Sequence, residues 1–197
     1  LHFVYGAFTI NKNNIMNKVK VALEKANETR ALVIGSGVID KISETFNQEF
    51  PEKKAVIVAD TITFDVAGKK VQKSLQESGV EQLDPFVFDD PNIFAEISYV
   101  EELEKFLKTN NAIPVAVGSG TINDLTKLAS HRTNREYMCV ATAASMDGYT
   151  AFGASITSDG AKQTFKCPAP VAVIADLDII CDAPSDMTAS GYTDLFS

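Results

Sequence analysis

The sequence has few cysteines, no long apolar run and comparatively little positive charge. Its three cysteines, Cys139, Cys167 and Cys181, are scattered and form no CxxC pair. This pattern argues against a disulfide scaffold or a zinc knuckle and predicts reduced thiols in a cytoplasmic protein. No apolar run approaches the roughly 20 residues of a membrane span, and Leu1–Ile10 is not preceded by a basic region. We therefore expect neither a membrane span nor a secretion signal.

Negative charge predominates, since 18 Lys and Arg stand against 26 Asp and Glu, for a formal net charge of -8. Such a charge repels nucleic acids and anionic membranes, so we expect neither as a partner. An anionic substrate would need a local basic pocket. The 197 residues, 45% of them hydrophobic, can bury one full core and the edge of a second.

Apolar runs of strand length recur along the chain and are separated by amphipathic stretches of helix length. The predicted strands are Arg30–Ile34, Ala55–Ala59, Pro85–Phe88, Ile113–Val117, Tyr137–Ala141 and Val171–Ala175. The spacing of apolar residues predicts helices over 15–26, 38–46, 100–107 and 121–131, and one that follows a loop at 61–64 and ends near 78. Leu1–Ile10 is rich in β-formers, and Asn11–Asn14 is predicted as a turn. Strands that alternate with helices indicate a parallel sheet with helices on both faces.

The pattern changes after Asp147. Two β-rich runs, 152–157 and 163–167, flank Ser158-Asp159-Gly160, and this turn signal predicts a β-hairpin. Pro184 precedes a helical pattern over Met187–Phe196. We interpret residues 1–183 as one α/β domain. Residues 184–197 would then begin a mainly helical second domain, the remainder of which we expect to be absent from this chain.

Two polar loops follow neighbouring strands and are expected to face one ligand, because parallel strands place their ligand crevice at their carboxyl ends. The first is Gly118-Ser119-Gly120, and the second runs from Thr142 to Asp147. Glycines let backbone amides approach a phosphate, and a helix that opens at Thr121 adds free N–H groups. The alternative for the first loop is an ordinary strand-to-helix turn, and for the second a polar loop with capping hydroxyls.

Four segments in register carry a family resemblance: GSGTINDLTK, TAASMDGYTA, ADLDII and MTASGYTDL. Together they resemble the sn-glycerol-1-phosphate dehydrogenases, a branch of the superfamily that holds iron-containing alcohol dehydrogenases, glycerol dehydrogenase and dehydroquinate synthase. The resemblance covers roughly Arg30 to Leu195. It implies an α/β fold with a Rossmann-like parallel sheet, flanking helices and a β-hairpin, followed by the start of a truncated helical metal-binding domain.

The resemblance implies NAD(H) or NADP(H) as cofactor. It places the pyrophosphate on Gly118, Gly120, Thr121, Ile122, Asn123 and Asp124, and the nicotinamide half against Thr142, Ala143, Ala144 and Ser145. Asp60 ends the second predicted strand, where a carboxylate can bind the ribose hydroxyls or simply cap the following turn. Its charge should disfavour a 2′-phosphate. Gly35 and Gly37 are interpreted as structural.

The resemblance also assigns the chemistry to two carboxylates. Asp147 would hold substrate hydroxyls, and Asp194 would bind substrate and act as one ligand of a divalent metal, with zinc expected and nickel or iron as alternatives. The other ligands in the family are two histidines further along, whose positions His2 and His131 do not match. Ala151 departs from the family pattern, where a serine contacts the cofactor. One carboxylate cannot hold zinc tightly, so this chain alone should bind metal weakly.

The function implied by the resemblance is hydride transfer between the cofactor and a small phosphorylated ketone or triol, interconverting dihydroxyacetone phosphate and sn-glycerol 1-phosphate, in an enzyme that could form homo-oligomers. Two alternatives remain open. One is a dehydrogenase of another polyol such as glycerol. The other is a non-catalytic nucleotide-binding module.

Overall fold

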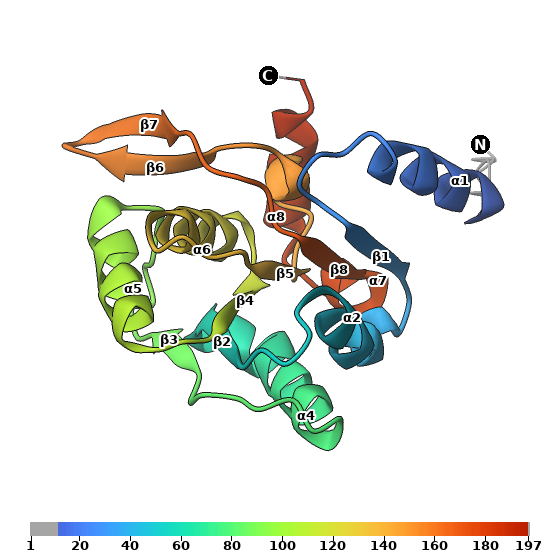
Figure 1. Ribbon diagram of the computed structural model, residues 1–197. Helices are drawn as coiled ribbons and strands as arrows, with labels where there is room; N and C mark the ends of the chain where they lie inside the picture. The colour runs from blue at the N-terminus through green and yellow to red at the C-terminus, as the bar shows by residue number, and fades with distance from the viewer. Residues whose placement is uncertain (1–11, 197) are drawn as a thin grey trace.

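The computed structural model describes residues 12–196 and contains a six-stranded parallel sheet with the strand order β1-β8-β5-β4-β2-β3 (Figure 1). A separate antiparallel hairpin, β6 with β7, completes the strands. The strands are β1 (Ala31–Gly35), β2 (Ala55–Asp60), β3 (Phe86–Phe88), β4 (Ile113–Gly118), β5 (Met138–Ala141), β6 (Ala154–Ser158), β7 (Ala161–Phe165) and β8 (Ala172–Asp176).

Helices connect the parallel strands. The α-helices are α1 (Lys12–Leu23), α2 (Ile42–Glu49), α3 (Thr61–Thr63), α4 (Lys69–Glu77), α5 (Ile97–Thr109), α6 (Gly120–Arg132), α7 (Leu177–Cys181) and α8 (Ser185–Asp194). Two 3-10 turns, η1 (Val38–Lys41) and η3 (Gly148–Thr150), and a π-helical segment, η2 (Phe64–Gly68), join them. Among residues 12–196, no helix is both long and apolar enough to cross a membrane.

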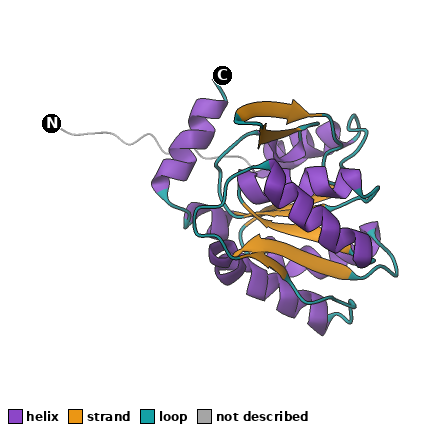
Figure 2. Cartoon of the chain, turned by 90° about the vertical axis from the view of Figure 1, so that its left-hand side faces the viewer, coloured by secondary structure: helices purple, strands orange, loops and turns teal. Residues whose placement is uncertain are grey.

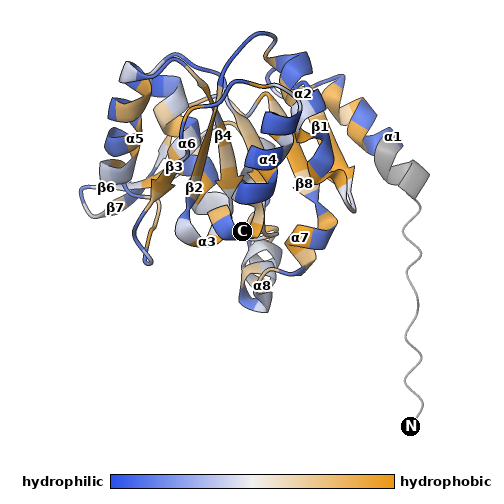
Figure 3. Ribbon diagram, turned by 90° about the horizontal axis from the view of Figure 1, so that it is seen from below, coloured by the Kyte–Doolittle hydropathy of each residue, from blue (hydrophilic) through white to orange (hydrophobic). Residues whose placement is uncertain are grey.

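The central strands are buried on both faces, which explains why they are almost wholly apolar instead of alternating with polar residues. Ile57, Val115 and Val117 point to one face and pack against α2 and α4. Val58 and Ala116 point to the other face and lie under α5, α6 and the hairpin. Figure 3 shows the resulting apolar sheet between helices with polar outer surfaces.

The carboxyl ends of the six parallel strands share one edge of the sheet, and α3 and α7 begin there, directly after β2 and β8. Figure 3 places α8 at the same edge, and Figure 2 shows it standing off the sheet beside the hairpin. The helices that follow the neighbouring strands β2 and β4 cover opposite faces. An open α/β sheet binds its ligand at such a switch point, so the candidate site is expected between these strands.

The predicted α/β fold, the six strands and the hairpin are confirmed. The turn predicted at Asn11–Asn14 is wrong over its described part, because α1 begins at Lys12. The loop predicted at Thr61–Phe64 is also wrong, since α3 starts directly after β2 with Asp60 as its cap. Helix α7 was not predicted. Leu1–Ile10 lies outside the described residues, and the division into domains at residues 183 and 184 stays a prediction.

Candidate functional site

The turn from β4 into α6 contains two glycines at which a Cβ would make close contacts, with Ile122 at Gly118 and with the flexible Met146 side chain at Gly120. A Cβ at Gly118 would lie 2.5 Å from the Ile122 Cβ, and one at Gly120 would lie 2.9 Å from the Met146 sulfur. Ser119 is the N-cap of α6, but its side chain makes no capping hydrogen bond. The first turn of α6 therefore offers backbone N–H groups and a positive dipole end that its own cap side chain does not occupy.

The loop after β5 contacts this turn through two backbone N–H groups. The Thr142 N–H donates to the Gly118 carbonyl at 3.1 Å, and the Gly120 N–H approaches the Ser145 hydroxyl at 3.5 Å. The Tyr149 hydroxyl donates to the Ala143 carbonyl at 2.7 Å. The two loops that the sequence predicted to face one ligand are thus brought together.

The other residues of α6 that were predicted to bind the cofactor are less accessible to a ligand. Thr121 is half-buried, whereas Ile122 and Asn123 are buried. The Asn123 side chain accepts a hydrogen bond from the Tyr137 hydroxyl at 3.0 Å. Ala144, in the neighbouring loop, is exposed.

The two residues predicted to be catalytic, Asp147 and Asp194, are in contact through the main chain of Asp147. The Asp147 N–H donates to Asp194 Oδ2 at 3.2 Å, and both residues are exposed. Helix α8 reaches this position because Gly191 is buried against the loop, where a Cβ would lie only 2.0 Å from the Ala144 carbonyl oxygen. Main-chain contact therefore sets how closely α8 lies over the loop.

Asp60 lies at the carboxyl end of β2, the strand next to β4. Its Oδ1 accepts the Thr63 N–H at 2.8 Å, and the Thr63 hydroxyl accepts the Asp60 N–H at 3.2 Å. This capping box corresponds to the structural alternative considered from the sequence. A role in binding ribose stays a prediction, and it would depend on Oδ2.

Two hollows flank Met187 at this edge of the sheet. The first, about 330 Å³, is lined mostly by polar residues: Ser119, Gly120, Thr121, Ser145, Met146, Asp186, Met187 and Ser190. The second, about 410 Å³, is mostly apolar and includes Ile62, Val66, Ala143, Ile179 and Met187. The hollow at the helix N-terminus suits a negatively charged part of a ligand. The apolar hollow beside it suits a flat, apolar part of the same ligand.

The described residues do not by themselves form a metal site. Within residues 12–196, no three His, Cys, Asp or Glu side chains lie close enough together to hold a metal ion. Asp194 and Asp147 could supply oxygen atoms from one side only. His131 is exposed at the far end of α6, away from both carboxylates.

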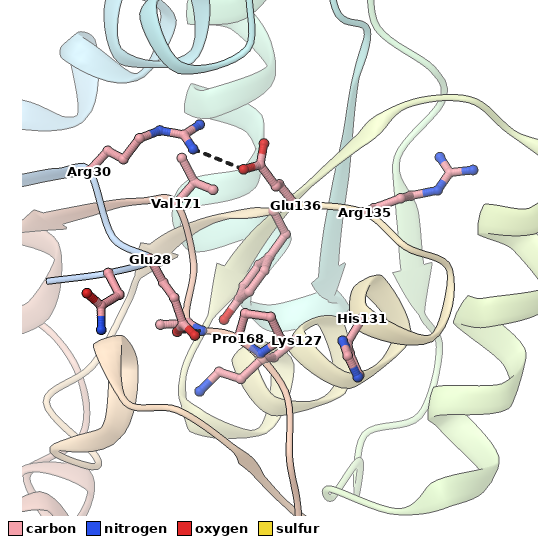
Figure 4. Close-up of a pocket in the computed structure, with 11 residues that line it drawn as sticks. Glu28, Arg30, Lys127, His131, Arg135, Glu136, Pro168 and Val171 are labelled. Atoms are coloured by element: carbon pink, nitrogen blue, oxygen red, sulfur yellow. Dashed lines mark hydrogen bonds and ion pairs between the residues drawn. The ribbon is translucent and has the colours of Figure 1, made fainter.

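Another hollow, about 220 Å³, lies at the opposite edge of the sheet and contains residues from the far end of α6 (Figure 4). Arg30 there is already paired with Glu136 at 3.0 Å and with Glu49 at 2.7 Å. The Glu28 carboxylate accepts the Ala169 N–H at 2.6 Å. None of the residues predicted to bind cofactor or substrate lines this hollow.

Sequence reasoning assigned no role to two buried charged residues. Asp176, 2% exposed, ends β8 and accepts backbone N–H groups from Gly37 at 3.2 Å, Ile39 at 2.9 Å and Asp178 at 3.0 Å. It therefore fixes the loop after β1, where Gly37 has a φ of +66°. This agrees with the structural interpretation of Gly35 and Gly37. The second residue is Lys127, within the GSGTINDLTK segment, which is 1% exposed.

Comparison with known proteins relates this arrangement to established enzymes. Glycerol-1-phosphate dehydrogenase [NAD(P)+] from Geobacillus thermodenitrificans is 35% identical over 145 residues, which are 73% of this chain and 36% of the relative. The enzyme of that name from Methanosarcina mazei is 35% identical over 169 residues, 85% of this chain and 46% of the relative. The chain thus spans less than half the length of these curated relatives.

Solved structures share the fold. Glycerol dehydrogenase from Schizosaccharomyces pombe superposes with a TM-score of 0.72 at 23% identity, covering 86% of this chain and 42% of that one. NADH-dependent butanol dehydrogenase A from Thermotoga maritima gives 0.73 at 20% identity, covering 86% and 50%. The family model described as iron-containing alcohol dehydrogenase matches residues 33–184. Since this match spans most of the chain, the protein belongs to the iron-containing alcohol dehydrogenase family.

Proposed function

We propose that this chain forms the cofactor-binding part of an NAD(P)-dependent, metal-dependent enzyme that interconverts dihydroxyacetone phosphate and sn-glycerol 1-phosphate. The observation that carries the proposal is the convergence at one sheet edge of the α6 N-terminus, the Thr142–Ser145 loop and the Asp147–Asp194 contact. The curated relatives named glycerol-1-phosphate dehydrogenase support the choice of substrate.

In this proposal the cofactor lies across the carboxyl ends of β2, β4 and β5. Its pyrophosphate would receive hydrogen bonds from the backbone N–H groups that open α6, where the helix dipole also favours negative charge. Asp60 would accept hydrogen bonds from the adenosine ribose, and Thr142 to Ser145 would border the nicotinamide. The hollow beside Gly120 suits the pyrophosphate, and the apolar hollow that includes Ile62 and Ala143 suits the nicotinamide.

The substrate would lie on the hairpin side of the same loop. A hollow of about 350 Å³ there is bordered by Ser145, Asp194 and Lys162. The Asp147 carboxylate would hold a substrate hydroxyl, and the Lys162 ammonium, from β7, would attract the phosphate. The bound nicotinamide supplies the hydride. Asp194 would provide one ligand of a metal whose remaining ligands lie outside the described residues, with zinc expected first and nickel or iron as alternatives.

The test is reduction of dihydroxyacetone phosphate by the full-length gene product, followed by NADH or NADPH absorbance. The enzyme is first treated with a chelator and then assayed with and without Zn²⁺, Ni²⁺ or Fe²⁺. Metal-dependent oxidation of the cofactor that yields the sn-1 isomer is the expected result. Unphosphorylated dihydroxyacetone, assayed in parallel, is expected to react far more slowly.

Two outcomes would replace the proposal. Faster turnover of unphosphorylated dihydroxyacetone would identify a polyol dehydrogenase. NADH binding without turnover of either ketone would identify a nucleotide-binding module without this chemistry. The proposed enzyme works with reduced thiols in the cytoplasm, and its cysteines Cys139, Cys167 and Cys181 are all free.

A further inference from the structure

Lys127 is a buried lysine whose ammonium group is occupied by main-chain oxygen atoms. The residue is 1% exposed, although α6 is an amphipathic helix on which a lysine is expected to face water. Figure 4 shows the Lys127 side chain among the residues that line the hollow at the opposite edge of the sheet. The Nζ atom donates to the carbonyls of Ala151 and Gly153, each at 3.0 Å, and of Gly148 at 3.4 Å. Three carbonyls of one short segment are thus bound by a single side chain of α6.

Asp124 completes this arrangement one helical turn earlier. Its Oδ1 lies 3.8 Å from Lys127 Nζ, and its Oδ2 accepts the Ser155 N–H of β6 at 3.1 Å. Burial raises the pKa of the Asp124 carboxyl group, against the opposing effect of the nearby Lys127 charge. The pair therefore connects α6 to both the 148–153 segment and the first residues of the hairpin.

A buried ammonium group is costly unless its hydrogen bonds are made, and removing one member of such a pair leaves an uncompensated charge. The 148–153 segment contains the short turn η3 and has two other attachments. The Tyr149 hydroxyl donates to the Ala143 carbonyl at 2.7 Å, and the Gly153 N–H donates to the Cys167 carbonyl at 2.7 Å. A third hydrogen bond, from the Ala151 N–H to the Gly148 carbonyl, lies within the segment. The segment begins directly after Asp147.

We propose that Lys127 and Asp124 are positioning residues that hold the 148–153 segment on α6 and thereby fix Asp147 beside Asp194. This inference rests on the proposed function, because it assigns the pair to turnover. It also gives Asp124 a different task from the pyrophosphate contact that the family resemblance implied. The helix that opens toward the cofactor thus also sets the place of the substrate-binding carboxylate.

The experiment uses the full-length protein with Lys127→Met, which keeps the length of the side chain and removes its charge. Asp124→Asn is the second variant, and Lys105→Met, at an exposed position of α5, is the matched control. Three quantities are measured: the NADH dissociation constant, kcat and KM for dihydroxyacetone phosphate, and amide hydrogen exchange over 147–155. All assays are run well below the melting temperature of the least stable variant.

We expect Lys127→Met to lower kcat/KM by roughly 10- to 100-fold, because displacing a reacting group by about 1 Å can cost about 10²-fold. Asp124→Asn should act in the same direction with a smaller loss. The NADH dissociation constant should stay at the wild-type value in both, and exchange should accelerate over 147–155 only. A residue needed only for stability would not separate turnover from cofactor binding in this way.

Wild-type kcat/KM and unchanged exchange in Lys127→Met would overturn the proposal. Weaker NADH binding in Asp124→Asn would restore the cofactor assignment of that residue and likewise overturn it. If Lys127→Met does not fold, hydrogen exchange over 147–155 in Asp124→Asn decides, because Asp124 also lines the hollow assigned to the substrate and its kcat/KM could change directly. If the wild-type protein does not reduce dihydroxyacetone phosphate, the proposed function fails by itself, and the exchange data alone decide whether the pair holds the segment.

Discussion

Replacing Asp176 tests whether the glycine-containing loop after β1 is structural or binds a ligand. Gly35-Ser36-Gly37 follows a parallel strand, so in sequence it competes with the turn before α6 as a dinucleotide site. In the structure the N–H groups of Gly37 and Ile39 are already bound to the Asp176 carboxylate, at 3.2 and 2.9 Å. Asp176→Ala removes these bonds without altering the loop sequence.

The size of the effect follows from the burial of each partner. A hydrogen bond to a charged group contributes about 1.5–3 kcal/mol, and an unsatisfied buried donor costs about 1–3 kcal/mol. Ile39 is buried, so its N–H would have no replacement, whereas water can reach the N–H groups of the exposed Gly37 and Asp178. We therefore expect Asp176→Ala to lower the free energy of unfolding by about 3–5 kcal/mol. Asp176→Asn, which keeps one acceptor, should cost about half as much.

Urea denaturation of the full-length protein, followed by circular dichroism, measures this change. Asp40→Ala, in the exposed part of η1, is the control and should have little effect. Strand β1 is three strands away from β4, about 14 Å at the usual strand spacing, so the loop that Asp176 fixes lies apart from the turn that opens α6. A loss of less than about 1 kcal/mol in Asp176→Ala would refute the reasoning.

Three further predictions concern the candidate site and the core. Asp60→Ala should weaken NADH binding, measured by fluorescence titration, and should cost about 1 kcal/mol of stability through the lost helix cap. Gly191→Ala should destabilise the protein by about 1–3 kcal/mol in urea denaturation, because its Cβ would lie 2.0 Å from a carbonyl oxygen of the facing loop. A thiol reagent at pH 8 should label the exposed Cys181 rapidly. It should label the buried Cys139 and Cys167 only on unfolding, because burial raises their pKa values to about 12 and about 11 and keeps the thiolate scarce.

Each of these predictions has a contrary outcome. Unchanged NADH affinity in Asp60→Ala would leave that carboxylate with capping as its only supported role. A Gly191→Ala protein as stable as a Thr188→Ala control would mean that α8 is not held by close contact. Rapid labelling of Cys139 in the native protein would contradict its burial in β5. Replacing Cys181 with Ser should abolish the fast labelling phase.

The strands could be predicted because β2, β4, β5 and β8 are short apolar runs that a two-sided parallel sheet requires. The hairpin could be predicted because Asp159-Gly160 supplies the left-handed residues of a tight turn, and both have positive φ. The start of α3 was missed because Thr61-Ile62-Thr63 contains only β-branched residues, which form helices poorly. Capping by Asp60 outweighs that preference.

The candidate site could be located from its loops, but the roles of two buried charged residues, Lys127 and Asp176, could not. Lys127 lies in an amphipathic helix, where a lysine normally faces water, but its ammonium group is bound by carbonyls of the 148–153 segment. Asp176 bonds to residues about 140 positions earlier in the chain, at Gly37 and Ile39. Local patterns contain no information on contacts of such long sequence separation.

The position of β1 at the edge of the sheet has a consequence for how the chain folds. Among the described strands β1 pairs with β8 alone, from Ala31 with Ala172 to Gly35 with Asp176. Of the described strands in this sheet, the first to be synthesised therefore pairs only after the last has emerged, while β2, β3, β4 and β5 can already assemble. Closing such a long connection is slow, since its entropy must be lost before any contact forms. During synthesis the apolar residues of β1 stay without their partner strand until residues 172–176 have emerged, so this segment is the part of the sheet most exposed to aggregation.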